Sequence, residues 1–244
     1  MKTLYINIIA IAVAGILFLS CEESRICVRG EGTITTKTLS ISDFTGVDLT
    51  EAANVVIAQG SSQEVSVTGH PNIIDRLSTN VSGNTWAIDL EKGCYDGYEL
   101  TVNITVPDIN DITLSGTGNI TINDFTNQED LFLSIPGAGD INLNSFTGSE
   151  NLSINVSGVG TISANGEFPD LKRLNLKFSG SGNYHGYPIA SDACEINIPG
   201  TGNCYVYVRE ILDIKIGGSG SIYYKGNPTI TKDISGSGNV IDDN

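Results

Sequence analysis

The chain has 244 residues and a formal net charge of −15, from 28 acidic and 13 basic side chains. This charge excludes a protein that binds nucleic acid or anionic lipid headgroups by electrostatic attraction. The 28 glycines exceed the usual share of about 7%. Ser, Thr, Asn, Ile and Val fill much of the remainder, a composition that favours strands and turns over helices.

Residues 1–20 have the features of an export signal. Lys2 precedes an apolar run, residues 8–19, and Ser20 stands directly before Cys21. A basic start, an apolar core and a small residue before the cleavage site predict a signal peptide rather than a membrane span. The cysteine at this place resembles a bacterial lipobox, with Phe18 where the usual pattern has Leu.

The lipobox resemblance implies that Cys21 becomes the lipidated first residue of the mature chain, with residues 21–24 as a tether. The alternative is ordinary cleavage that leaves Cys21 as a thiol. Glu22 and Glu23 are similar to the surface-export signal of Bacteroidetes lipoproteins. Loss of Lys2 with the signal changes the net charge from −15 to −16, so contact with a membrane would come from the lipid anchor rather than from charge.

A Gly-x-Gly phrase recurs seven times, first as LSGTGNI at residues 114–120 and last as ISGSGNV at residues 234–240. The first glycines of successive copies are 21, 21, 22, 20, 18 and 18 residues apart. No helical pattern, third glycine or Walker lysine follows, so a nucleotide-binding loop is excluded. The phrases are structural turns of a repeat protein. Their glycines are Gly116, Gly118, Gly137, Gly139, Gly158, Gly160, Gly180, Gly182, Gly200, Gly202, Gly218, Gly220, Gly236 and Gly238.

Apolar residues alternate with polar ones on both sides of each turn. Two and four residues before the first glycine, and four residues after it, the copies carry almost only aliphatic or aromatic side chains. This period of two predicts two half-buried strands joined by a bend. Copies one period apart should stack as parallel rungs, which predicts an all-β fold, a β-solenoid. Glycine would suit the bend by adopting positive φ. An antiparallel sandwich with glycine hairpins is the alternative.

The repeat continues weakly toward the N-terminus. Residues 28–34 and 49–55 fit the template, and residues 65–69 and 86–90 are looser copies. We therefore expect one β-helix over residues 25–244, with degenerate rungs at 25–110 and regular rungs at 111–244. A short helix or loop is expected at residues 71–77, because Pro71 opens this stretch.

Three phrases together resemble a known family. They are VRGEGTI at residues 28–34, SDFTGV at residues 42–47 and the repeated Ser-Gly-x-Gly-Asn-Ile turn. This combination resembles the Bacteroidetes family called putative auto-transporter adhesin, head GIN domain, over nearly the whole mature chain. The resemblance implies a right-handed parallel β-helix on an exported, often lipid-anchored protein. It also implies a role in adhesion and no recognised catalytic residues.

Candidate catalytic and metal-binding residues are few. His70 and His185 have no partner at metal-ligand spacing, so no metal or other cofactor is expected. Asp140 follows a turn in the manner of calcium-binding repeats, but the other turns lack the acid. A glycosidase-like carboxylate pair could come from a group of acids that we interpret as solvated turn residues. These acids are Asp108, Asp111, Asp124 and Asp130.

Four cysteines follow Cys21. Cys194 and Cys204 fall in the interior columns and are expected as small core residues. Cys27 and Cys94 lie in less regular sequence, and an oxidising compartment would permit a disulfide between them.

An outward aromatic stripe is the one feature that favours a binding function. Five and seven residues after the first glycine, early copies carry Thr, Asn and Ser, whereas the copies that begin at Gly180, Gly200 and Gly218 carry five rings and one lysine. Such patches mark partner or ligand sites, and planar rings suit sugar faces. A protomer interface, a folded-back segment or plain β-propensity would also explain them. The stripe comprises His185, Tyr187, Tyr205, Tyr207, Tyr223 and Lys225.

Taken together, these patterns predict a non-enzymatic, lipid-anchored outer-membrane protein, surface-exposed or periplasmic, that binds a glycan or protein ligand. A polysaccharide lyase or hydrolase on the same scaffold is one alternative, and a structural envelope spacer is another. Neither the ligand nor the oligomeric state follows from the sequence.

Overall fold

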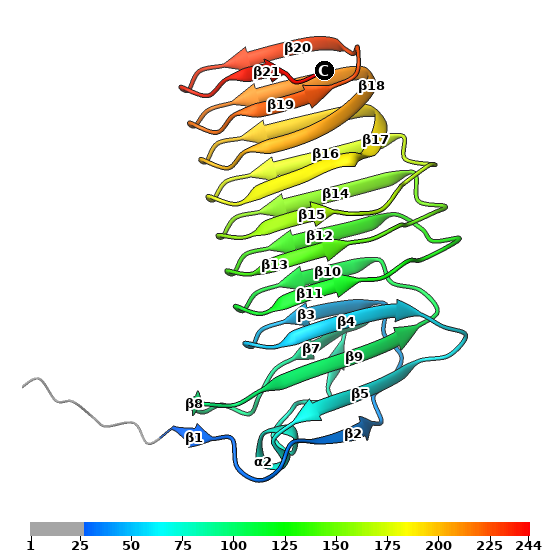
Figure 1. The fold of residues 1–244 in the computed structure, drawn as a ribbon, viewed down its shortest axis with the longest axis vertical. Coiled ribbons are helices and arrows are strands. Elements are labelled where there is room, and N and C mark those ends of the chain that lie inside the picture. Colours follow the sequence, from blue (N-terminus) through cyan, green and yellow to red (C-terminus); the bar gives the residue numbers. More distant parts are fainter. Residues whose placement is uncertain (1–26) are drawn as a thin grey trace, which may run out of the picture.

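A computed structural model describes residues 27–244, so the expected signal peptide and Cys21 lie outside the described residues. The chain forms a column of stacked rungs, each made of two strands (Figure 1). The strands build two walls of parallel neighbours that enclose one apolar interior. The predicted β-solenoid is therefore confirmed, and the sandwich alternative is wrong because neighbouring copies pair in parallel.

Wall A consists of the strands that precede the turns. In spatial order its strands are β7 (Thr85–Ile88), β3 (Gly46–Leu49), β10 (Asp111–Leu114), β12 (Leu131–Ile135), β14 (Asn151–Val156), β16 (Arg173–Phe178), the later parts of β17 (Asn183–Ile198) and β18 (Cys204–Ile216), and β20 (Thr229–Ile234).

Wall B consists of the strands that follow the turns. In spatial order they are β9 (Leu100–Val106), β4 (Asn54–Gln59), β11 (Asn119–Ile122), β13 (Asp140–Leu143), β15 (Thr161–Ala164), the first parts of β17 and β18, β19 (Ile222–Lys225) and β21 (Val240–Asp242).

Residues at equivalent positions stack in register along each wall. In wall B, Ile120 pairs with Ile141, and Ile141 pairs with Ile162. All three are fully buried, as the alternating pattern predicts. Complete burial of an aliphatic side chain contributes roughly 1.5–3 kcal/mol, and only the stack of rungs provides that burial.

The phenylalanines of a second, unpredicted column stack inside the solenoid. Phe125, Phe146 and Phe168 are buried, and the centroids of successive rings are 5.6 and 5.5 Å apart. The sequence held a signal for them. The phrase Asp-Phe-Thr at residues 43–45 recurs at residues 124–126, and Ser-Phe-Thr follows at residues 145–147.

The turn glycines serve close packing of backbones rather than positive φ. None of the 14 turn glycines has φ in the left-handed region, so the expected reason for glycine is wrong. A Cβ on Gly137 would lie well under 3.0 Å from the carbonyl oxygen of Gly116 in the rung before, and the same clash recurs at each later turn. The backbone of each rung thus leaves no space for a side chain at the glycine positions of the next turn.

The N-terminal part departs from the expected rungs. Residues 49–55 form the predicted turn between β3 and β4. By contrast, residues 65–69 lie in β5 (Glu64–Gly69), which runs antiparallel to β9 and to β2 (Thr35–Leu39). Residues 86–88 lie in β7, which stacks parallel on β3 as the expected rung strand, and β6 (Val81–Ser82) joins β7 antiparallel. The antiparallel strands cover the first rung, and the predicted short helix is α2 (Pro71–Ile74).

The expected rung at residues 28–34 is also absent. Strand β1 (Val28–Arg29) pairs instead with β8 (Tyr95–Asp96) in a small separate sheet. A disulfide joins Cys27 and Cys94 beside it, with 4.5 Å between the Cα atoms. Because the bridge closes a segment with a sequence separation of 67, it restricts the unfolded chain and stabilises this end of the column.

We predict that Gly137→Ala lowers the free energy of unfolding by at least about 2 kcal/mol, because the new methyl group meets backbone that cannot rotate away. Ala138→Ser, in the exposed middle of the same turn, should change it by less than about 0.5 kcal/mol. Urea unfolding of both variants measures the difference. Equal stability of the two variants would contradict this account of the turns.

Candidate functional site

The predicted aromatic stripe exists as a stack of three rings on the outside of wall B. His185, Tyr205 and Tyr223 pair in register on neighbouring strands. Their centroids are 4.8 and 4.6 Å apart, and the ring planes differ by 17° and 8°. We call these three residues the aromatic ladder. Because the rings face one another, the inner faces are not available to a sugar, and the ladder presents mainly ring edges.

The second half of the predicted stripe does not form a column. Tyr207 pairs with Lys225 as expected, but its partner on β17 is Ala190 rather than Tyr187. Four residues separate His185 from Ala190, whereas one separates the paired Tyr205 from Tyr207. The extra residues bulge out of the strand and displace Tyr187.

Tyr187 instead lies against the ladder. Its ring meets that of Tyr205 edge-on at 5.8 Å, and the Lys225 Nζ lies 4.7 Å from its centroid. Its hydroxyl donates a hydrogen bond to the Asp243 carboxylate. Burial, followed by this hydrogen bond, raises the pKa of Tyr187 above its usual value. A segment of the same chain thus covers part of the stripe.

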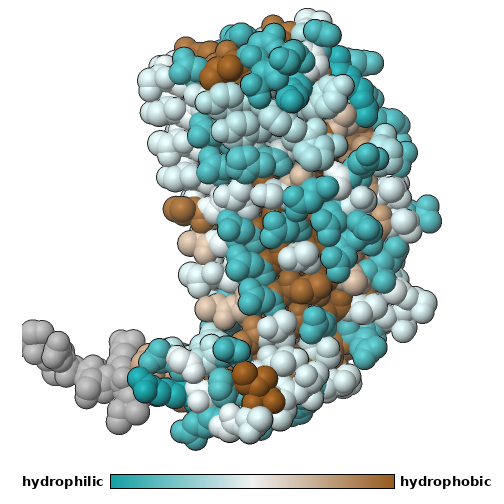
Figure 2. All heavy atoms as spheres, in the orientation of Figure 1, coloured by the Kyte–Doolittle hydropathy of each residue, from teal (hydrophilic) through white to brown (hydrophobic). Residues whose placement is uncertain are grey.

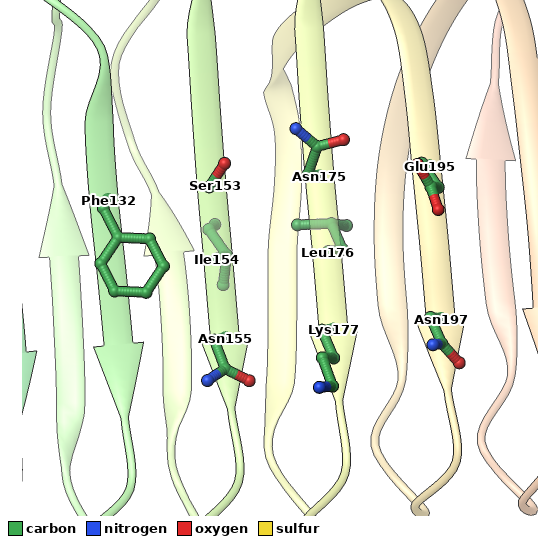
Figure 3. Close-up of a pocket in the computed structure, with 9 residues that line it drawn as sticks. All are labelled: Phe132, Ser153, Ile154, Asn155, Asn175, Leu176, Lys177, Glu195 and Asn197. Carbon is green, nitrogen blue, oxygen red and sulfur yellow. The ribbon is translucent and has the colours of Figure 1, made fainter.

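An open groove crosses wall A, on strands that the sequence did not single out. It has a volume of about 390 Å³ and spans β12, β14, β16 and β17 (Figure 3). Its lining residues are Phe132, Ser153, Ile154, Asn155, Asn175, Leu176, Lys177, Glu195 and Asn197. We call it the Phe132 groove.

The groove exists because side chains of unequal length follow one another across the wall. Phe132 pairs with Ser153, and Ser153 pairs with Asn175. The short serine leaves a gap between the two larger side chains, and Figure 3 shows the Phe132 ring nearly face-on beside it. These side chains occupy the outward positions three and five residues before each turn. That is where a tabulation of outward residues on both walls would have found them.

The outer surface is mixed in character. Figure 2 shows one long face of the column, with hydrophobic residues gathered mainly over its middle and lower part and a few more at its top end, among hydrophilic and neutral residues. Phe132 is 39% exposed and Tyr207 is 40% exposed, so both walls present an aromatic ring to solvent.

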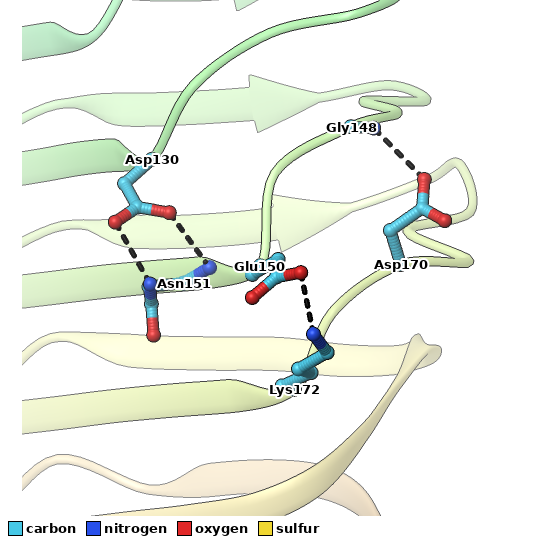
Figure 4. Close-up of polar contacts among 6 residues, drawn as sticks. All are labelled: Asp130, Gly148, Glu150, Asn151, Asp170 and Lys172. Atoms are coloured by element: carbon cyan, nitrogen blue, oxygen red, sulfur yellow. Dashed lines mark hydrogen bonds and ion pairs between the residues drawn. The ribbon is translucent and has the colours of Figure 1, made fainter.

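Most of the candidate acids hold neighbouring rungs together. Asp124 accepts a hydrogen bond from the backbone N–H of Ser145 at 2.9 Å, and Asp140 accepts one from Thr161 at 2.8 Å. Asp130 accepts two bonds from Asn151, from the backbone at 3.0 Å and from the side chain at 2.8 Å (Figure 4). Each acid therefore caps the rung one period later.

The remaining candidate acids have other surroundings. Asp108 accepts a hydrogen bond from the Gln128 amide at 3.4 Å. Burial, and then the nearby Asp48 carboxylate, raise the pKa of Asp111. Asp48 and Asp111 lie on the adjacent strands β3 and β10. Neither lines the Phe132 groove. Asp111 lines a separate and larger surface hollow of about 690 Å³, together with Glu129, Asp130 and Glu150.

The candidate histidine His70 and the two interior cysteines form no catalytic or metal-binding group among the residues that the structure describes. The Nδ1 atom of His70 lies 3.5 Å from the Glu99 backbone nitrogen, at the limit of a hydrogen bond. Within residues 27–244, no group of His, Cys, Asp and Glu side chains could hold a metal ion. Cys194 and Cys204 are buried free thiols. Over the same residues, no helix is long and apolar enough to cross a membrane.

Residues 43–228 match the family model described as "Putative auto-transporter adhesin, head GIN domain". The chain belongs to this family. No curated protein matches it. The family's description points to an extracellular or envelope-associated adhesin rather than to an enzyme.

Solved structures share the solenoid over nearly their full length. A putative adhesin from Bacteroides fragilis NCTC 9343 is 23% identical, with a TM-score of 0.79. A putative lipid binding protein from Parabacteroides distasonis ATCC 8503 is 25% identical, with a TM-score of 0.70. A putative adhesin from the same strain is 20% identical, with a TM-score of 0.65. The first two alignments cover 88% of this chain and 99% of the other, and the third covers 88% and 98%.

The core beneath the ladder contains a buried tyrosine, Tyr184, whose effect on stability can be tested. Tyr184 is fully buried and its hydroxyl has no hydrogen-bond partner among the described residues. Burial raises its pKa. The folded protein therefore keeps this proton at a pH where the unfolded chain, with a tyrosine pKa near 10, loses it. Tyr184 thus makes stability fall as the pH rises above about 10.

We expect Tyr184→Phe to raise the free energy of unfolding at pH 7 by about 1 kcal/mol, since an unsatisfied hydroxyl is removed. The variant should also lose less stability than the parent between about pH 9 and pH 11. Urea unfolding across this range measures both effects. Tyr207→Phe, which alters a more exposed ring, is the control. Parallel pH curves for the parent and Tyr184→Phe would count against the assignment.

Proposed function

We propose that this chain is a lipid-anchored protein of the cell envelope that binds a ligand on its outward faces without transforming it. The observation that supports this most is the Phe132 groove, an open cleft with one exposed ring and a polar rim on a regular wall. The description of the family as an adhesin agrees with such a role.

The scaffold suits the display of a binding surface at a distance from a membrane. The N-terminal elements β1, β2 and α2 lie at one end of the column, and the C-terminus lies at the other (Figure 1). Neighbouring strands are about 4.8 Å apart, so the aromatic ladder begins about 24 Å from β9, five strands along wall B. An anchor at Cys21 would leave the later rungs pointing away from the lipid.

Binding is favoured over catalysis by the role of the acids. Asp124, Asp130 and Asp140 are engaged in capping backbone groups. A glycosidase needs two carboxyl groups that flank the bond to be cleaved. Among the residues that line the groove, Glu195 is the one acid, and its in-register neighbour on β18, Asp213, does not line it.

A binding array tests the central claim. The soluble chain from residue 22 contains every described residue and is applied to neutral and acidic oligosaccharides, extracellular-matrix proteins and phospholipid vesicles. We expect saturable binding to at least one glycan or protein class, with no release of reducing ends during prolonged incubation. Cleavage of a bound glycan would favour the enzyme alternative. The absence of binding to every probe would favour a structural spacer.

The anchor has its own test. In cells that process lipoproteins, the parent chain should incorporate labelled palmitate and fractionate with membranes, and Cys21→Ser should do neither. Cys27→Ser is unsuitable as a control because it breaks the disulfide, so Ser24→Ala serves instead. Label that persists in Cys21→Ser would contradict the proposal. Protease treatment of intact cells then distinguishes surface exposure from a periplasmic location.

A further inference from the structure

We propose that the Phe132 groove binds a neutral oligosaccharide, with one pyranose unit stacked on the Phe132 ring and further units held by the polar residues of β14, β16 and β17. This inference rests on the proposed binding function and adds the ligand class and the contacts. The ladder, which the sequence favoured, is the weaker candidate.

The first argument is the free ring face. Phe132 is 39% exposed, and the ring lies nearly face-on in the view onto the wall (Figure 3). The C–H groups on one face of a pyranose carry partial positive charge and are attracted to the negative face of an aromatic ring. The ladder rings are unsuited to this contact because their inner faces are turned to one another at 4.8 and 4.6 Å.

The second argument is the kind of polar group at the groove. Asn155, Asn175 and Asn197 line it on three successive strands. A primary amide both donates and accepts hydrogen bonds, which matches a sugar hydroxyl that does the same. Within residues 27–244, none of these three side chains has a hydrogen-bond partner in the protein. By contrast, Asn183 is occupied in capping the Asn203 backbone.

The third argument is size. The volume of about 390 Å³ falls within the range of about 300–1,000 Å³ for small-ligand sites. Three strand spacings separate Phe132 from Glu195, a length of about 14 Å. This length suits a short oligosaccharide that runs across the strands.

The fourth argument is charge. Lys177 and Glu195 balance each other within the groove, and the chain as a whole carries −15. Such a field disfavours sulfated or sialylated glycans at low ionic strength. A lipid tail is also disfavoured, because Phe132 is the one exposed apolar side chain among the lining residues that the structure describes.

The test compares variants of the soluble chain from residue 22 on an array of neutral oligosaccharides built from hexoses and N-acetylhexosamines. Phe132→Ala should weaken binding about tenfold or more, and Phe132→Trp should retain it, because stacking needs a ring. Asn175→Ala should weaken binding about fivefold through a lost amide contact. Tyr207→Ser is the matched control, since Tyr207 is 40% exposed on the other wall, and it should bind as the parent does.

The outcomes separate the two proposals. Loss in Phe132→Ala with retention in Phe132→Trp and Tyr207→Ser supports the groove. Unchanged affinity in a folded Phe132→Ala overturns it, as does parental binding to matrix proteins or vesicles without binding to neutral glycans, although the proposed binding function survives both results. A further variant, Tyr205→Ser, removes the middle ring of the ladder. If binding is lost in Tyr205→Ser but kept in Phe132→Ala, the ladder is the site and the groove is not. No binding to any probe overturns both proposals. Circular dichroism verifies that each variant is folded.

Discussion

The close approach of one backbone turn to the next is the constraint on which the structure depends. At every Gly-x-Gly turn after β10, the carbonyl group of the preceding rung occupies the space that a Cβ would need. The constraint has one direction along the column, since the atoms that a Cβ on each glycine would meet belong to the rung before it. The turn between β3 and β4 carries Glu51 and Ala53 at the equivalent positions. This exception has a cause, because residues 89–99 connect β7 to β9 by a long excursion and leave no tight turn beneath.

This constraint explains how far the sequence could predict the fold. A constant period and strict alternation determine the interior columns and the register, so the ladder of His185, Tyr205 and Tyr223 was found from spacing alone. The displaced Tyr187 was not found, because a repeat pattern cannot tell that three extra residues between His185 and Ala190 leave the strand. The antiparallel strands over the first rung were missed for a related reason. A strand with period two has the same pattern whichever direction it runs. Direction there is decided by the chain reversals at residues 60–63, between β4 and β5, and at residues 83–84, between β6 and β7.

The two walls differ in how their outward side chains are used. On wall B, the stacked rings pack against one another. Tyr187 adds an edge-on ring contact and a hydrogen bond to Asp243. These contacts tie the irregular rung of β17 to the last rung. Aromatic pairs of this kind contribute about 0.5–1.5 kcal/mol each to stability. This stabilisation is enough to explain the presence of the rings without a ligand. A stack of rings on a solenoid is therefore weak support for a ligand site unless a ring face remains free.

The Phe132 groove meets that stricter condition, and its origin shows why such sites are hard to recognise in sequence. Interior columns and turn glycines fix the backbone, so outward residues three and five positions before a turn are free to vary without loss of fold. A cleft then needs no special motif, only a short side chain such as Ser153 between longer ones. The function of this architecture should accordingly lie in differences of side-chain length between neighbouring rungs. Those differences become visible only once the register places Phe132, Ser153 and Asn175 side by side.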